Sequence, residues 1–507
     1  MTKKMTFPLN SLSLVLALAL ALTGCTLGPD FKAPQAPVAS QATPPESYSY
    51  TAVPLQKQTE SAPGHAGVAQ NLVPAQDIPA QWWTVFHSTE LDELIRSALT
   101  QSPNLASAQA ALRQAQENYT AVSGNTLYPN VTANLGLQRE HASELTTFIP
   151  GGALFTLFNA SINISYTLDV FGANRRELES MQAAVDYQRF QVEAAYLTLT
   201  SNLVTTAIRE ASLRSQLHAT SEILEFQTTQ LDVIEKQFTA GAIPMSSVLA
   251  QRTLLAQTRA SLPGLEKALQ QTRNQLAVYA GRLPSEGGLP EFHLESMQLP
   301  SDLPVSVPSA LLKQRPDIRA TEALLHQAGA QVGVATANQF PQISLTAAYG
   351  GMSPTASGLT NKEWSFWNLG AGVVQPLFDA GALSAKKRAS VAAYDQADAQ
   401  YRATVLVAFQ NVADSLQALD LDAKTLKQQV EVEAVARQTL DMTTRQFELG
   451  ALNSLALLDA KRNYQSARTA LVQAEAARYA DTAALFLALG GGWWNRPELK
   501  DISVKSE

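Results

Sequence analysis

Two long runs of this sequence contain neither proline nor glycine, one over 174–239 and the other over 382–449. Because these two residue types are the strongest helix breakers, each run predicts a single uninterrupted helix. A helix of roughly 65 residues would be about 100 Å long, which a compact domain does not easily accommodate. Apolar residues recur at intervals of seven along more than one line, as in Phe190, Leu197 and Val204. A helix with two such stripes has neighbours on both sides, so the pattern predicts a palisade or tube of helices.

The chain also repeats itself once. The segment "QFTAGAIPMSSVLAQR" (237–252) is similar to "QFELGALNSLALLDAK" (446–461), and three further pairs of segments match in the same order. An ordered set of matches predicts two copies of one structural unit. We place the first copy at 88–281 and the second at 305–490.

Each copy is predicted to contain a helix, two strands, the long helix and a further helix. The strands are expected at about 128–144, 155–171, 340–352 and 364–378 from their alternation of apolar and polar residues. One interpretation is a soluble sheet packed on a core. The other is a set of membrane strands that are apolar towards lipid and polar towards a water-filled lumen. Aromatic residues at the strand ends suit an interfacial belt and favour the second interpretation: Tyr128, Phe171, Phe340, Trp364, Trp367 and Phe378.

Glycines mark the ends of these elements. Gly241 and Gly450 each follow a long helix, where a left-handed cap is expected. The next helix begins a few residues later, which predicts a tight helical hairpin at one end of each copy. Gly172 and Gly381 mark the joints at which a strand becomes a helix.

The N-terminus carries the only cysteine of the chain. A short apolar run over 9–22 follows Lys3 and Lys4 and ends in "LTGC" at Cys25. The run has the length of a signal-peptide core and is too short to span a bilayer. The ending resembles a bacterial lipobox, which implies that 1–24 is a signal peptide and that Cys25 carries a diacylglycerol thioether and an N-acyl group. In the alternative interpretation, Cys25 belongs to the signal peptide and is discarded with it.

Three segments lie outside the two copies, and the first of them is predicted to form no core of its own. Residues 25–80 are rich in Pro, Gln, Ala and Ser, a composition that favours extended conformations, and we interpret them as a linker behind the lipid anchor. The Pro- and Gly-rich segment 282–304 is interpreted as a linker between the copies, and 491–507 as a C-terminal tail.

Composition argues against several functional classes. The net charge is −7 and the basic residues are scattered, so nothing suggests a nucleic-acid partner. No two of the six histidines have metal-ligand spacing, and neither a nucleophile elbow nor a phosphate-binding loop occurs. We therefore expect no enzyme, no metal and no cofactor other than the covalent lipid.

The ordered motifs resemble those of the TolC-like outer-membrane efflux channels, specifically the NodT-type lipoproteins. They are the lipobox and "LDVFGANRR", "RPDIRATEALL", "QPLFDAGAL", "RQFELGALNSLALLDAKR" and "ALGGGW". The resemblance covers nearly the whole mature chain. It implies an α+β membrane protein that forms a homotrimer, in which each chain gives four strands to one twelve-stranded β-barrel continued by a long α-helical barrel. It also implies partners, namely a periplasmic membrane-fusion (adaptor) protein, an inner-membrane RND transporter and outer-membrane lipid.

The same resemblance implies passive conduction of small molecules such as drugs or toxic compounds, gated at the periplasmic tip. Leu455 and Asp459 match the residues that point into the lumen there, and their spacing of four places both on one helix face. Three Asp459 carboxylates around a threefold axis would favour cations. In the alternative interpretation, Leu455 packs between helices and Asp459 is merely solvated. A second acidic residue found in some relatives is Ala456 here, so the gate is not copied in full.

The helical turns are the expected contacts with the adaptor. The residues are Phe238, Gly241, Ala242, Phe447, Gly450 and Ala451. The alternative for them is an ordinary solvated turn. Two other functions stay open, namely the outer-membrane component of a type I protein secretion system and a lipid-anchored periplasmic adaptor or coiled-coil tether.

Overall fold

The computed structural model describes residues 26–34, 56–143, 150, 152–306 and 308–497. The chain divides into two compact units, and each unit combines parts of both sequence copies. Unit 1 comprises Met1–Pro34, Ala110–Arg189 and Ala320–Arg402, and unit 2 comprises Gln35–Gln109, Phe190–Arg319 and Ala403–Glu507. The copies of the repeat are therefore interleaved in space rather than folded one after the other.

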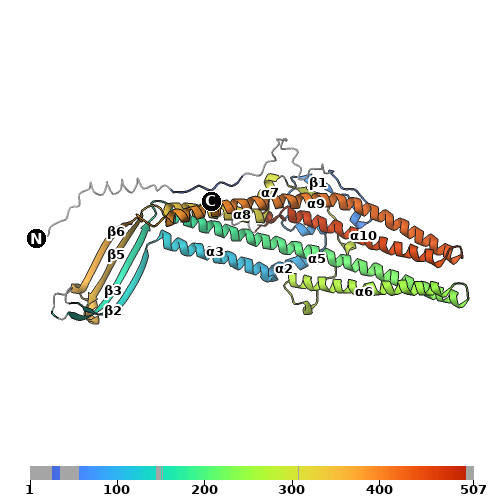
Figure 1. Cartoon of the computed structure of the whole chain (residues 1–507), viewed down its shortest axis with the longest axis horizontal. Coiled ribbons are helices and arrows are strands. Elements are labelled where there is room, and N and C mark those ends of the chain that lie inside the picture. The colour runs from blue at the N-terminus through green and yellow to red at the C-terminus, as the bar shows by residue number, and fades with distance from the viewer. Residues whose placement is uncertain (1–25, 35–55, 144–149, 151, 307, 498–507) are drawn as a thin grey trace. The chain divides into compact units, whose positions relative to one another are not determined.

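The predicted order of elements is confirmed in both copies (Figure 1). The first copy runs α3 (Pro103–Leu127), β2 (Asn130–Ala142), β3 (Ala153–Leu168), α5 (Ala173–Thr239) and α6 (Met245–Tyr279), and the second runs α8 (Pro316–Ala337), β5 (Gln342–Ser353), β6 (Ser365–Val374), α9 (Ala382–Glu448) and α10 (Ser454–Ala488). The short helices α2 (Thr89–Gln101) and α7 (Pro308–Gln314) precede them. At the ends that join the helices, each strand is two to four residues shorter than predicted, because those residues form the joints.

The two long helices are continuous, as the absence of proline and glycine predicts. Helices α5 and α9 each contain 67 residues. An aspartate just before each helix accepts hydrogen bonds from its free N–H groups. Asp169 accepts from the Asn174 and Arg175 amides at 3.1 and 3.0 Å. Asp379 accepts from Gly381 and Leu383 at 2.8 and 2.7 Å, and these bonds lower the pKa of that carboxyl. No helix in the described ranges is both long and apolar enough to cross a membrane.

The turns between the helices have the predicted left-handed glycines. The φ angle is 75° at Gly241 and 74° at Gly450. In both turns the next N–H closes the helix end, from Ala242 to the Gln237 carbonyl and from Ala451 to the Gln446 carbonyl, each at 2.9 Å. Asn453 caps the start of α10, since its side chain accepts from the Ala456 amide at 3.0 Å.

Unit 2 contains a core that the predicted linkers and tail help to build, which corrects the interpretation of residues 25–80 as a linker without a core. Strand β1 (Asn71–Pro74) pairs in parallel with β4 (Asp302–Val305). Trp82, from the short helix η3 (Trp82–Phe86), is fully buried and stacks on Phe486 of α10 with ring centroids 5.6 Å apart. Buried apolar residues of this core lie in all three segments: Ala66, Ile78, Phe292, Leu294, Met297, Leu299, Leu303 and Trp493. Irregular backbone can bury large side chains without any periodic pattern, which is why composition alone missed it.

Candidate functional site

Strands β2, β3, β5 and β6 form one antiparallel sheet in that order, and the sheet has two chemically different faces. Residues directly opposite each other in a sheet point to the same side, so the register identifies each face. Ile162 lies opposite Ala133 on one side and Tyr349 on the other, and Tyr349 lies opposite Trp367. The neighbouring row contains Thr132, Asn163, Ala348 and Asn368. One face is therefore mainly apolar and the other mainly polar.

The apolar face lies open across all four strands. Its exposed large side chains are Val131, Leu135, Leu137, Ile162, Ile164, Leu345, Tyr349, Trp367, Leu369 and Val373. Leu135 and Leu369 are 86% and 78% exposed, although such residues are normally covered. This arrangement contradicts the interpretation of a soluble sheet packed on a core, since no described part of the chain covers the face. An apolar face of this width marks a surface made for lipid or for another macromolecule.

The outer edges of the sheet are the second unusual feature. Strand β2 pairs only with β3, and β6 pairs only with β5, among the described strands. Each outer edge therefore presents a row of N–H and C=O groups that no strand of the described residues pairs with. Long apolar edges of this kind are normally paired with another strand, because they otherwise template aggregation.

Aromatic side chains lie at both ends of the sheet. At the end that joins the helices, the rings of Phe171 and Phe340 stack with centroids 5.0 Å apart, and Phe378 is 91% exposed. Towards the other end, Trp367 of β6 lies directly opposite Tyr349 of β5. These positions agree with the two aromatic girdles expected of membrane strands.

The predicted gate residues lie together on one exposed face near the start of α10. Leu455 is 60% exposed and Asp459 is exposed, whereas Leu457, Leu458 and Ala460 are buried. The buried side of the helix belongs to a small core that joins both helical hairpins, formed by Ile234, Val248, Leu440, Phe447, Leu457 and Ala460. Leu455 therefore does not pack between helices within the chain, and both side chains are free to face a lumen.

The turn residues divide into two groups. Phe238, Gly241, Ala242, Gly450 and Ala451 are exposed at the ends of the hairpins. The sixth predicted contact is instead buried in the small core and supports the turn from beneath; this is Phe447.

Lys461, two residues beyond Asp459, was not singled out by sequence reasoning. Its side chain is buried, its ammonium lies 5.2 Å from the centre of the Phe226 ring, and burial lowers its pKa to about 8. No local pattern identifies it, because Phe226 is supplied by α5, far away in the sequence.

A pair of carboxyl groups links α9 and α10 in unit 2. Burial, a hydrogen bond that the protonated Asp481 carboxyl donates to Asp422, and the negative charge of Asp422 together raise the pKa of Asp481 to about 7. A carboxyl whose pKa is raised on folding stabilises the fold at low pH and loses that contribution as the pH rises through the folded pKa. We therefore expect the apparent melting temperature of the wild type to fall by a few degrees between pH 5 and pH 8.

The variant Asp481→Asn should remove this dependence. It should melt higher than the wild type at pH 8, and the difference should shrink towards pH 5. Differential scanning fluorimetry in detergent over this pH series measures both quantities. If the melting temperatures of the two proteins changed with pH in the same way, the raised pKa of Asp481 would be contradicted.

The acylation of Cys25 and the expected absence of a metal stay predictions. Cys25 lies outside the described residues. Among the residues that the structure does describe, no group of three His, Cys, Asp or Glu side chains is placed to hold a metal ion.

The sheet with its open apolar face and the paired long hairpins define an outer-membrane channel subunit, and comparison with known proteins agrees. The sequence profile of the family described as "Outer membrane efflux protein" matches residues 94–282 and 307–491. The chain belongs to this family of outer-membrane efflux channels, which are transporters and not enzymes. Its place is the outer membrane of a Gram-negative bacterium.

Individual relatives are similar over most of the chain. It is 33% identical to the pyoverdine export outer membrane protein OpmQ of Pseudomonas aeruginosa, over 83% of this chain and 88% of that protein. It is 28% identical to the cation efflux system protein CusC of Escherichia coli, over 94% of this chain and 98% of that protein. The solved structure of the outer-membrane channel OprN has a TM-score of 0.82 at 26% identity and covers 92% of this chain and all of that one.

Proposed function

We propose that the protein is the outer-membrane exit duct of a tripartite efflux system of the RND type. It would conduct small molecules, such as drugs or other toxic compounds, passively from a periplasmic adaptor and an inner-membrane pump to the exterior. The observation that carries the proposal is the four-stranded sheet with one open apolar face and two open edges. Relatives named for the export of pyoverdine and of cations and the efflux of toluene use the same fold for different cargo, so cargo choice would rest mainly with the pump.

Closure among copies would resolve both unusual features of the sheet. In lipid every backbone polar group needs a partner, so an open sheet cannot span the membrane. Three copies joined edge to edge, β6 of one chain to β2 of the next, would give a twelve-stranded barrel with the apolar face outward. The polar face would then line a water-filled lumen. The 67-residue helices of the three chains would continue the barrel as a tube about 100 Å long.

The lipid on Cys25 would add a second attachment to the membrane. An acyl chain on the new N-terminus and two more on the sulfur anchor a protein firmly, whereas a single chain does so only marginally. Intact-mass measurement of the mature protein tests this. The expected mass is that of a chain starting at residue 25 plus one S-diacylglyceryl group and one N-acyl group, and an unmodified or absent Cys25 would contradict the proposal.

Asp459 would set the charge at the narrow end of the tube. The variant Asp459→Ala should lower the preference for cations over anions several-fold in planar-bilayer recordings, because three carboxylates leave the constriction. Glu448→Gln is the matched control, since it removes an exposed carboxylate from the same hairpin at the end of α9. Equal selectivity in the wild type and Asp459→Ala would retire the gate assignment.

The exposed turns would receive the adaptor. A Cβ at Gly450 meets no atom within 4 Å, so Gly450→Trp projects a ring into solvent at the cost of about 1 kcal/mol of left-handed strain. We expect cells that express this variant together with the adaptor and the pump to lose efflux and become more susceptible to drugs. The yield of trimer should stay normal. Unchanged drug susceptibility would mean that the turns are not part of the adaptor interface.

Two alternative functions are distinguishable. A type I secretion component would share the fold and the trimer but would export a protein substrate, so an affinity-tagged chain should retrieve an ABC-type transporter rather than an RND pump. A lipid-anchored tether would not bury its sheet in a membrane. The open apolar face argues against the tether.

A further inference from the structure

Residues 26–34, which we call the strap, directly follow the proposed acylation site and lie against the start of α5 in unit 1. The Leu27 amide donates to the Phe171 carbonyl at 3.4 Å. Thr26 packs against Gly172 so closely that a Cβ on Gly172 would lie 2.9 Å from the Thr26 Cα atom. These contacts place the beginning of the strap at the joint between β3 and α5.

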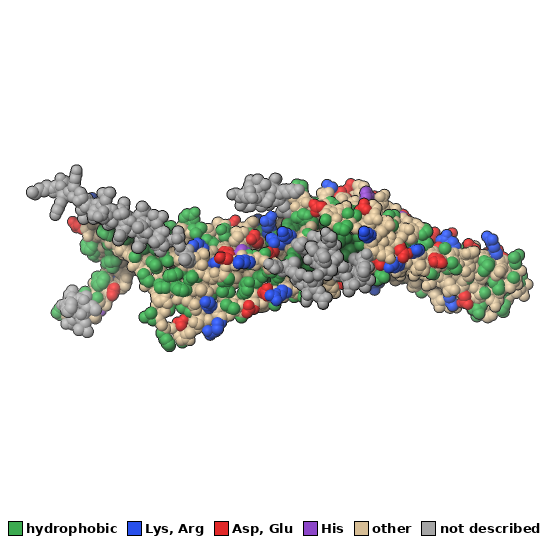
Figure 2. Space-filling model, turned by 90° about the horizontal axis from the view of Figure 1, so that it is seen from above, with side chains coloured by type: hydrophobic (Ala, Val, Ile, Leu, Met, Phe, Trp, Pro, Cys, Tyr) green, Lys and Arg blue, Asp and Glu red, His purple; other side chains and the backbone are tan. Residues whose placement is uncertain are grey.

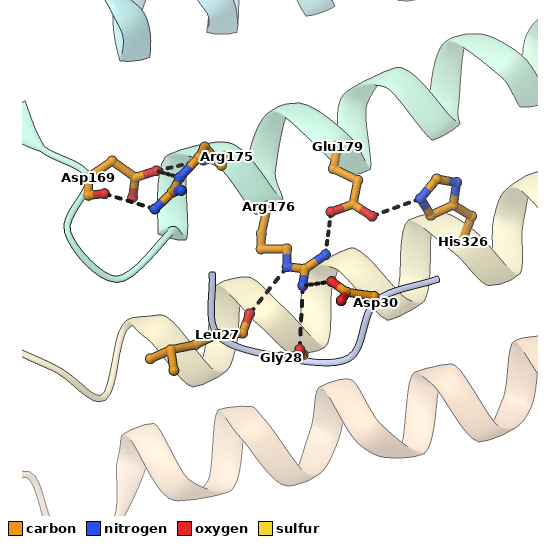
Figure 3. Close-up of polar contacts among 8 residues, drawn as sticks. All are labelled: Leu27, Gly28, Asp30, Asp169, Arg175, Arg176, Glu179 and His326. Atoms are coloured by element: carbon orange, nitrogen blue, oxygen red, sulfur yellow. Dashed lines mark hydrogen bonds and ion pairs between the residues drawn. The ribbon is translucent and has the colours of Figure 1, made fainter. Parts of the chain in front are cut away.

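The guanidinium of Arg176, on α5, binds the strap and also pairs with Glu179 (Figure 3). Its Nε donates to the Leu27 carbonyl at 3.2 Å, and its Nη2 donates to the Gly28 carbonyl at 3.4 Å and to Asp30 Oδ1 at 2.6 Å. Its Nη1 donates to Glu179 Oε2 at 2.7 Å. Burial would lower the pKa of Arg176, but the hydrogen bonds to the Asp30 and Glu179 carboxylates outweigh it and raise the pKa. The side chain is only 5% exposed, so its charge is buried and fully paired.

A second contact fixes the strap further along. Glu179 Oε1 lies 2.8 Å from Nε2 of His326, on α8. The His326 ring in turn stacks on Phe31 of the strap, with centroids 4.2 Å apart and planes 17° apart. Burial would raise the pKa of Glu179, but its bonds from Arg176 and His326 outweigh it and lower the pKa. One connected polar network therefore joins two helices to both halves of the strap.

Glycines make the close fit possible. Gly28 has a φ of +99°, and a Cβ there would lie 2.5 Å from the Gly333 Cα atom. A Cβ on Gly333 would in turn lie 2.8 Å from Cγ of Arg176. Neither position tolerates a side chain while the strap is docked.

We propose that Arg176, Glu179 and His326 form a receptor for the strap and thereby seat the lipid on Cys25 beside the base of the sheet. This inference rests on the proposed function, in which Cys25 is acylated and the sheet spans the outer membrane. Cys25 is one peptide bond from Thr26, so a docked strap holds the acyl chains where the apolar face begins. A lipid fixed at that point raises the local concentration of the sheet at the bilayer before the strands insert.

Docking of the strap is measurable by itself. Lys32 is exposed within it, and trypsin needs a locally detached segment to cut there. We expect trypsin to cut Gly28→Ala and Arg176→Met about tenfold faster than the wild type. Mass spectrometry of the products measures the rate of cutting. Gly64→Ala is the matched control, because Gly64 has a φ of +100° and open space around its Cβ. Arg175→Met controls for the charge at the neighbouring position, since Arg175 pairs with Asp169. Equal cutting of all variants would overturn the receptor.

The link to the lipid needs a second experiment on the full chain in a Gram-negative host. A ten-residue Gly/Ser spacer between Cys25 and Thr26 leaves the strap and the lipid intact but separates them by about 18 Å on average. The spacer and Gly28→Ala should each lower the fraction assembled in the outer membrane several-fold, and their combination should lower it no further. Gly28 lies on the strap, so its substitution leaves the helices intact.

The outcomes separate this inference from the proposed function. Wild-type protein without acyl groups would overturn the lipid proposal and this inference together. An acylated and inserted wild type would leave the proposed function standing, and the inference alone would then fall in either of two cases. In one, the spacer variant assembles normally; in the other, Gly28→Ala lowers assembly by the same factor with and without the spacer.

Discussion

An arginine at position 162 is expected to abolish assembly in the membrane, whereas an arginine at the adjacent position 163 is expected to be tolerated. Ile162 lies on the apolar face, opposite Ala133 and Tyr349, and Asn163 lies on the polar face. Arginine on the lipid side of a barrel costs about 2–4 kcal/mol near the bilayer midplane, and a trimer would carry this cost three times. On the polar side the same side chain would reach water in the lumen.

Ile162→Arg and Asn163→Arg introduce the same side chain at adjacent positions but on opposite faces of the sheet. Each variant is therefore the control for the other. The measurement is the yield of trimer from detergent-solubilised outer membranes, because the lipid on Cys25 would keep even an uninserted chain at the membrane. Equal loss in both variants would mean that the faces are not distinguished by lipid. Loss in Asn163→Arg alone would reverse the assignment of the faces.

Truncation of a buried tryptophan in unit 2 is the second large effect. Trp82 is fully buried, stacks on Phe486 and meets Trp83 edge-on with ring centroids 6.3 Å apart. Removing such a side chain typically costs about 3–5 kcal/mol through lost burial and the cavity left behind. We expect Trp82→Ala to shorten the half-life of the purified protein at elevated temperature at least tenfold. Leu283→Ala, at a site 64% exposed, should leave the half-life unchanged.

The half-life is the appropriate quantity because membrane assemblies usually unfold irreversibly. A Trp82→Ala protein as durable as the wild type would show that the segment before α2 is peripheral.

Periodic patterns were sufficient to predict most of the fold. The long helices, the four strands and the glycine turns all follow from local sequence, since each depends on residues close along the chain. The joint glycines Gly172 and Gly381 have φ angles of 82° and 85°, as their place between strand and helix suggested. The shared exposed face of Leu455 and Asp459 also follows from helical spacing alone.

Contacts between distant segments could not be predicted in this way. The pairing of β1 with β4 joins residues more than two hundred positions apart, and neither strand is long enough to show alternation. Arg176 stood within the recognised motif "LDVFGANRR", yet no pattern indicates that its partners are Leu27, Gly28 and Asp30. The interleaving of the two copies likewise arises from tertiary packing, which single-chain periodicity does not encode.

On the face shown in Figure 2, basic and acidic side chains are interspersed and form no extended patch of one sign. This distribution agrees with the scattered charges of the sequence and its net charge of −7. Steering of cargo by a large charged surface is therefore not expected on this face. Selectivity would instead depend on the lumen and its narrow end.

The most direct measurement is the oligomeric mass and single-particle image of the mature protein in detergent. The proposed closure of the sheet would give a trimer, with one detergent belt around the strands and a helical tube about 100 Å long beyond it. A particle with the mass of three acylated chains and this belt is the predicted result. A monomer or dimer whose sheet lies outside any detergent belt would contradict the channel and would favour a lipid-anchored tether.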